Sequence, residues 1–180
     1  MNVSKKTGNI KKLTVSAVCL AFCMALPFLT GQIPQIGNVI SPMHIPVLLC
    51  GFICGPYYAA AIGLIAPVLR FLMFGMPPLM PIGIAMCLEL ATYGLVSGVL
   101  YRVLLKKTVF IYVSLIAAMI LGRFVWGIAC FMLLGVSGMP FTWEMFVSGA
   151  FTLAIPGIII HIALIPVIVM ALRKTGSFMA

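Results

Sequence analysis

The sequence predicts an all-α integral membrane protein with six transmembrane helices, of which the second is short or broken. Hydrophobic residues make up 64% of the chain and charged residues only 7%, which is more apolar than a soluble domain of this length. The apolar runs are separated by short connections that contain proline and glycine. Basic residues gather in alternate connections, as they do in multi-pass membrane proteins. We expect one membrane domain over residues 1–180.

The first span is expected at residues 13–31, directly after a polar, basic segment at 1–12. The second apolar run, 42–54, is shorter than the about 20 residues that a perpendicular span needs, and it contains Pro46. We therefore expect it to be a short or broken helix. The remaining spans are expected at 57–74, 82–101, 109–134 and 146–172.

The distribution of lysine and arginine predicts that both termini are cytoplasmic, because positive residues are retained on the inner side during insertion. With the N-terminus inside, the three outer connections contain no basic residue. The inner segments carry Lys5, Lys6, Lys11, Lys12, Arg102, Lys106, Lys107, Arg173 and Lys174. These residues lie next to the membrane rather than on one soluble face, so a nucleic-acid partner is not expected. The expected location is the bacterial cell membrane.

Ionisable residues inside the predicted spans are candidates for a binding site, because an unpaired charge in a bilayer costs several kcal/mol. At a rise of about 1.5 Å per residue, Glu89 and Arg123 lie at comparable depths on consecutive helices. One interpretation is a structural ion pair between them. The other is an outward-facing pocket, in which the planar guanidinium of Arg123 binds a carboxylate or ring oxygen of a solute.

Aromatic residues accompany both charges at helical spacing. Trp126 shares a helix face with Arg123, and Tyr93 shares one with Glu89. An aromatic wall beside a charged group is typical of small-molecule sites. We therefore include both aromatic residues in the predicted substrate site.

Four further polar residues are weaker candidates. Arg70 is close enough to the outer surface to extend to the lipid headgroups, which we favour over ligand contact. His161 is deep on the last span, and we interpret it as a packing histidine with satisfied hydrogen bonds. His44 follows Pro42 near the outer surface, where it could cap the short helix or close a lid. Asn38 in the first outer loop could reach over the pocket.

The sequence does not predict an enzyme. The chain contains two acidic residues, Glu89 and Glu144, too few for two-carboxylate hydrolysis or a metal cage. It has no phosphate-binding loop, so any use of ATP would depend on a partner. Two cysteine pairs have a spacing that could place two metal ligands together, but we favour the interpretation that these thiols are apolar filler, with no metal, cofactor or disulfide. The pairs are Cys19 with Cys23 and Cys50 with Cys54.

The first span carries a stripe of small residues. Ala17, Ala21 and Ala25 recur at four-residue steps, which keeps their methyl groups on one face of a helix. In a bilayer, such a stripe lets another helix approach closely, and van der Waals packing drives the contact. We expect this stripe to be a docking surface.

Nearly the whole chain resembles the substrate-binding S components of energy-coupling factor vitamin transporters. The resemblance rests on the six short helices, the lysine-rich N-terminus, the AxxxAxxxA stripe, and two segments. These are SPMHIPVLLCGFICGPYYAAAIGLIAPVLR and FGMPPLMPIGIAMCLELATYGLVSGVLYR. The resemblance implies capture of a vitamin or related micronutrient outside the cell, and docking through Ala17, Ala21 and Ala25 onto a transmembrane T subunit driven by two ATPases. It implies a binding site in the outer halves of helices four to six and the first and last outer loops.

Two other functions stay open at this point. A self-sufficient secondary transporter could couple protonation of Glu89 to solute movement, although such carriers usually show two related halves and we find no convincing repeat. A structural subunit would leave the buried charges unexplained. The two intramembrane arginines favour a solute with a carboxylate, such as pantothenate or niacin, while a pyridoxine-like ring stacked on Trp126 or Tyr93 fits almost as well.

Overall fold

The computed structural model describes residues 3–30, 41–104, 107–136, 138, 140–152 and 154–174, with the side chains of the first segment described from 8 to 28. Within these ranges the ordered structure is helical and contains no strand. The α-helices are α1 (Val3–Ala25), α3 (His44–Ile53), α4 (Pro56–Phe74), α5 (Ile84–Val103), α6 (Thr108–Val136), α7 (Trp143–Val147) and α8 (Ile155–Lys174). A 3-10 helix, η1 (Leu26–Thr30), and two π-helical turns, η2 (Leu79–Gly83) and η3 (Ser148–Thr152), continue or precede them.

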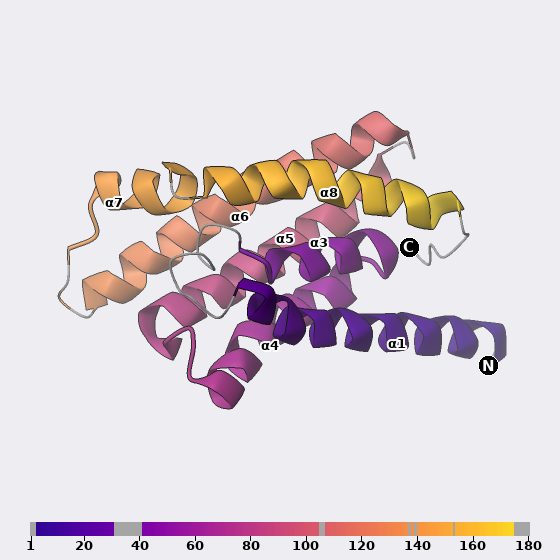
Figure 1. The fold of residues 1–180 in the computed structure, drawn as a ribbon, viewed down its shortest axis with the longest axis horizontal. Coiled ribbons are helices and arrows are strands. Elements are labelled where there is room, and N and C mark those ends of the chain that lie inside the picture. Colours follow the sequence, from indigo (N-terminus) through magenta and orange to yellow (C-terminus); the bar gives the residue numbers. More distant parts are fainter. Residues whose placement is uncertain are drawn as a thin grey trace.

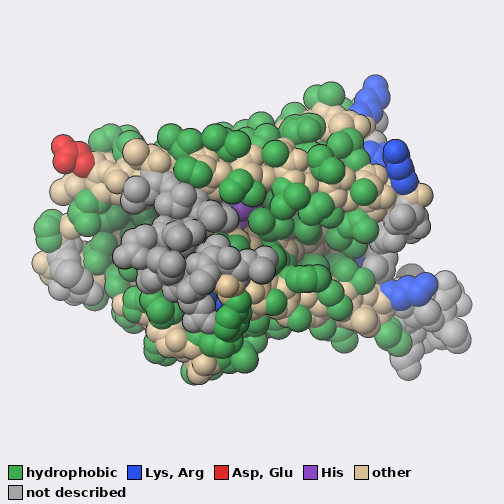
Figure 2. Space-filling model, viewed as in Figure 1, with side chains coloured by type: hydrophobic (Ala, Val, Ile, Leu, Met, Phe, Trp, Pro, Cys, Tyr) green, Lys and Arg blue, Asp and Glu red, His purple; other side chains and the backbone are tan. Residues whose placement is uncertain are grey.

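The described helices confirm a membrane protein with several apolar spans and a shorter second one. Five segments are long and apolar enough to cross a bilayer, and α3 is an apolar helix of only 10 residues. The start of α1 and the end of α8 lie at the same end of the bundle (Figure 1). Basic side chains gather at that end, whereas the visible acidic side chain lies at the other, and the flanks between them are mainly hydrophobic (Figure 2). That the basic end is cytoplasmic stays a prediction from the positive-inside rule.

The short helix α3 forms the centre of the bundle. Nine of its ten residues are buried, and it contacts α1, α4, α5 and α8. A helix that is apolar on every side is stable only when it is enclosed on every side. The short apolar run therefore became an internal helix, surrounded by the longer ones.

Helices α4 and α5 approach each other through glycine. A Cβ atom built on Gly63 would lie 2.5 Å from the backbone nitrogen of Ala91, and one built on Gly94 would lie 2.6 Å from the backbone carbonyl carbon of Ala59. Both distances are far below any ordinary contact, so these positions accept only a hydrogen atom. Such backbone approach is how helices pack tightly in lipid, where no hydrophobic effect drives them together.

Helix α1 packs through one face and leaves the other exposed. Ser16, Cys19 and Cys23 are buried, and the Ser16 Oγ lies 3.6 Å from the Cys50 Sγ on α3. On the other side, the alanines at 17, 21 and 25 are all exposed. The helix also begins at Val3, inside the segment predicted only as basic and polar. Hydropathy detects only the part of a helix that lies in the membrane. Lysine favours a helix, so α1 can continue beyond the membrane into water.

The segment predicted as the sixth span is long and apolar enough for one span over Trp143–Lys174. It contains helix α7, the π-helical turn η3, and α8, which begins at Ile155. Pro156 suits this start, because proline has no backbone N–H to donate to a preceding turn but fits the first turn of a helix.

Candidate functional site

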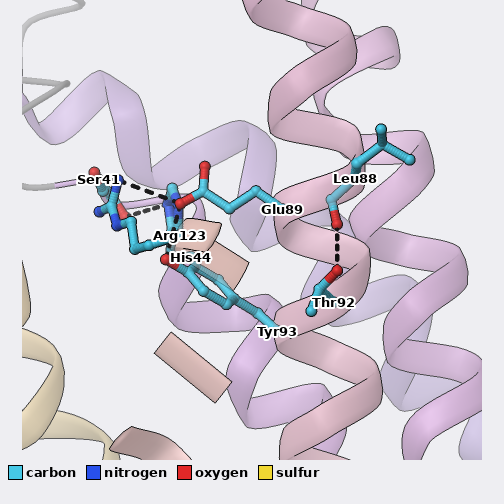
Figure 3. A network of polar contacts seen from close by, with 7 residues as sticks. All are labelled: Ser41, His44, Leu88, Glu89, Thr92, Tyr93 and Arg123. Atoms are coloured by element: carbon cyan, nitrogen blue, oxygen red, sulfur yellow. Dashed lines mark hydrogen bonds and ion pairs between the residues drawn. The ribbon is translucent and has the colours of Figure 1, made fainter. Parts of the chain in front are cut away.

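The carboxylate of Glu89 is the centre of a buried polar cluster built by three helices. Glu89 lies on α5 and is 2% exposed. Its Oε1 accepts a hydrogen bond of 2.8 Å from the Tyr93 hydroxyl, one turn further along α5. The same oxygen lies 3.2 Å from Nη1 of Arg123 on α6 and 3.6 Å from Nε2 of His44 on α3 (Figure 3). The three side chains therefore meet on one oxygen atom of one carboxylate.

The sequence positions these groups by simple local rules. Glu89 and Tyr93 are four residues apart and share a face of α5. Gly122 on α6 leaves room for the aromatic ring, because a Cβ atom at this position would overlap the ring of Tyr93. Arg123, the next residue, then faces the carboxylate. His44 enters the cluster because it is the first residue of the enclosed helix α3.

His44 contacts both the backbone near the start of α3 and the Glu89 carboxylate. Its Nδ1 lies 3.1 Å from the backbone carbonyl oxygen of Ser41, which can only accept, so Nδ1 donates a hydrogen bond. Its Nε2 lies 3.6 Å from the Glu89 carboxylate, which is longer than an ordinary hydrogen bond. The guanidinium of Arg123 and the carboxylate of Glu89 are therefore the closer pair in the cluster.

His161 on α8 belongs to the same cluster. Its ring is 1% exposed and stacks on the ring of His44, with the centroids 5.9 Å apart and the planes at 27°. Neither ring nitrogen makes a hydrogen bond within the described part of the chain, although the Ser41 backbone lies near enough to interact electrostatically. The burial of His161 is as expected, and partners that meet the geometric criteria for a hydrogen bond are not found for it among the described residues.

Arg70 and Trp126 make other contacts than those of this cluster. Arg70 on α4 is 7% exposed, and its guanidinium carbon lies 5.5 Å from the centroid of the Phe74 ring. The side chain is thus enclosed by protein and not extended outward as we favoured from the sequence. Trp126 packs edge-on against Phe141 at 6.2 Å, on the side of α6 toward α7. Asn38 lies outside the described residues.

An apolar groove of about 340 Å³ is lined by the C-terminal half of α6 and by none of the residues of the polar cluster. Aromatic side chains from α6, α7 and the segment between them form most of its walls. The lining residues are Phe124, Gly127, Ile128, Phe131, Phe141, Thr142, Trp143 and Phe146. It offers hydrophobic contact but no charged group.

All six cysteines are buried and free of disulfides. Among the described residues, no three His, Cys, Asp or Glu side chains are grouped as metal ligands would be.

Comparison with known families agrees with this architecture. A model of the substrate-specific component of ECF transporters matches residues 11–172. The chain belongs to this family. No curated protein sequence matches the chain. As an ECF substrate-specific component, the protein is a multi-pass plasma-membrane subunit of a transporter rather than an enzyme, and membership in the family implies association with T and ATPase subunits.

Proposed function

We propose that this ECF substrate-specific component captures a small carboxylate-bearing micronutrient at the Glu89 cluster and delivers it through a T subunit powered by two ATPases. The observation that carries the proposal is the buried grouping of Arg123 and His44 around one carboxylate, 3.2 and 3.6 Å away. The guanidinium of Arg123 and the imidazole of His44 would offer charged and neutral hydrogen-bonding groups to a carboxylate of the ligand.

The proposed substrate class follows from these groups. A carboxylate such as that of pantothenate or niacin would pair with the guanidinium of Arg123, and Glu89 would accept a hydrogen bond from a hydroxyl or N–H of the same solute. A pyridoxine-like ring could use Glu89 in the same way and pack on Tyr93. Arg70, Trp126 and Asn38 remain proposed contacts at the periphery.

The docking part of the proposal rests on α1. The exposed alanines Ala17, Ala21 and Ala25 form a smooth strip on a helix that the rest of the chain leaves uncovered on this side. Small side chains at a helix surface favour close approach of a second helix in lipid. We assign this strip to the T subunit.

Substrate identification and an Arg123→Ala variant test the binding part. The protein is purified in nanodiscs, and the small molecule that it retains is identified by mass spectrometry. Loss of Arg123 is expected to weaken binding of that compound by about 10- to 100-fold, because a hydrogen bond to a charged group contributes on the order of 1.5–3 kcal/mol. Full affinity in Arg123→Ala would remove the basis of the proposed site.

The transport mechanism requires a separate experiment. The proposal expects uptake only when the T subunit and both ATPases are present and hydrolysing ATP. A proton-coupled secondary transporter that uses Glu89 would instead move the solute in liposomes that contain this chain alone. Accumulation under the latter condition would favour the secondary transporter.

A further inference from the structure

The polar cluster contains more hydrogen-bonding groups than its members use. Both ring nitrogens of His161 and the Nε of Arg123 are buried without a hydrogen-bond partner among the described residues. The Nε2 of His44 has only its long contact with Glu89. A buried polar atom without a partner is costly and rare in native structures. Several of them in one cluster leave donors and acceptors that a bound solute would satisfy.

We propose that His161 is a direct substrate-contacting residue, which binds the substrate through its ring nitrogens beside Nε of Arg123. This inference rests on the proposed function and extends the site from α3, α5 and α6 to α8. It assigns a role to a residue that the sequence pattern had placed in the core.

The position of His161 fits contact with a ligand better than a role in packing alone. Its ring stacks on His44, which itself approaches Glu89, so α3, α5 and α8 meet at these two rings. A residue needed only to fill space would be better replaced by an aromatic or aliphatic side chain, which has no polar atom to satisfy. An imidazole offers one donor and one acceptor when neutral, so it can bind a carboxylate oxygen or a hydroxyl of the substrate.

The test uses three substitutions of His161 and one control. His161→Phe keeps a planar ring and removes both nitrogens, while His161→Asn and His161→Gln keep an amide near the position of one nitrogen or the other. Ser114→Ala is the matched control, because Ser114 on α6 is also fully buried and its Oγ also lacks a hydrogen-bond partner within the described chain. It precedes Arg123 by nine residues, or about 13 Å along the helix.

The probe is the dialysable fraction of yeast extract supplemented with nicotinate, pantothenate and pyridoxine. Each purified full-length variant is incubated with it in nanodiscs and washed, and the retained compound is identified by mass spectrometry and then titrated. His161→Phe is expected to bind this compound at least about tenfold more weakly than the wild type. His161→Asn or His161→Gln should bind it with an affinity within about threefold of that of the wild type. Ser114→Ala should bind as the wild type does.

Thermal melting without the probe separates binding from folding. Because His161→Phe removes unpaired buried nitrogens, its melting temperature should equal or exceed that of the wild type. The melting temperature of Ser114→Ala should do the same. Undiminished binding by His161→Phe would overturn the inference and leave the proposed function intact. Equal loss of binding in all three variants would assign His161 to packing and overturn it too. If the wild type retained no compound, the proposed function itself would fail, and this inference with it.

Discussion

Small residues form two kinds of surface in this molecule, one inside the bundle and one on α1. Inside, Gly63 and Gly94 bring α4 and α5 so close that even a methyl group would overlap the neighbouring backbone. On α1, the alanines of the exposed stripe have no such neighbour. The two surfaces share the same chemistry, since both present almost no side chain to a passing helix.

The difference lies in whether the chain supplies the second helix. In lipid, a surface of small residues is favourable only when another helix lies against it, because the contact depends on van der Waals packing. The interior contacts are complete within the chain. The stripe on α1 is incomplete, and its partner must be another protein or lipid. For an ECF substrate-specific component, we propose that the partner is the T subunit.

The largest expected effect is at the interior surface. Gly63→Leu would drive a side chain into the backbone of Leu90 and Ala91 on α5. This backbone cannot move away without separating α5 from α4. We expect a loss of at least about 3 kcal/mol of stability, the upper end of ordinary overpacking, seen as loss of monodisperse protein and of cooperative melting. The control is Ala61→Leu on the exposed face of the same helix. Similar behaviour of the two variants would show that close packing of α4 on α5 is dispensable.

The next largest effect is expected at the exposed stripe, where a large side chain should impair transport without impairing folding. Ala21→Trp adds a large ring to a surface with no neighbour in the chain, so the protein should fold and bind its substrate within about twofold of the wild type, as surface changes usually do. Uptake in cells with the complete transporter should fall more than about tenfold, because the partner helix can no longer approach. Phe22→Trp, also exposed but on another side of α1, should transport normally. Normal uptake by Ala21→Trp would disprove docking through this stripe.

A smaller effect is expected where an interior glycine shapes the binding site. The added methyl group of Gly122→Ala would push the Tyr93 ring away from α6 and disturb its 2.8 Å hydrogen bond to Glu89. Substrate affinity should fall by roughly 5- to 10-fold, the value of one ordinary hydrogen bond, while the protein remains folded. Isothermal titration with the identified substrate measures this. Gly135→Ala on the same helix, where a Cβ would meet nothing within 4 Å, is the control.

The smallest effect is expected for a small residue replaced by a small residue. Ala17→Ser adds one oxygen atom to the exposed stripe and hardly changes its shape, so uptake should stay within about twofold of the wild type. Uptake rates at several substrate concentrations would detect a larger change. A loss as severe as that of Ala21→Trp would mean that chemical identity, and not smoothness, determines docking.

The sequence predicted the helices well because hydropathy and helix length are local properties. Six apolar segments, the second of them short, were expected from runs of apolar residues alone. The five long described segments and the short helix α3 agree with this. The separate helical elements α7, η3 and α8 within the sixth segment were not expected, since the start of a helix depends on backbone hydrogen bonding, as at Pro156, and not on hydropathy. The helical continuation of α1 to Val3 was missed for a related reason, because lysines end a span without ending a helix.

The candidate site was predicted in part. Equal depth on consecutive helices suggested the contact between Glu89 and Arg123, and the structure joins them at 3.2 Å. The rotation of each helix about its axis is a tertiary property, so the sequence did not reveal that Trp126 packs toward Phe141. His161 was judged alone as a core residue, because its proximity to His44 depends on how α8 crosses α3.

The shortness of α3 sets how deep a captured molecule can sit. At about 1.5 Å per residue, ten residues reach about 15 Å, half of the roughly 30 Å thickness of the hydrocarbon layer. His44, the first residue of α3, therefore lies about 15 Å from the other end of that helix, and a solute bound at the proposed Glu89 site would be held at that distance from it.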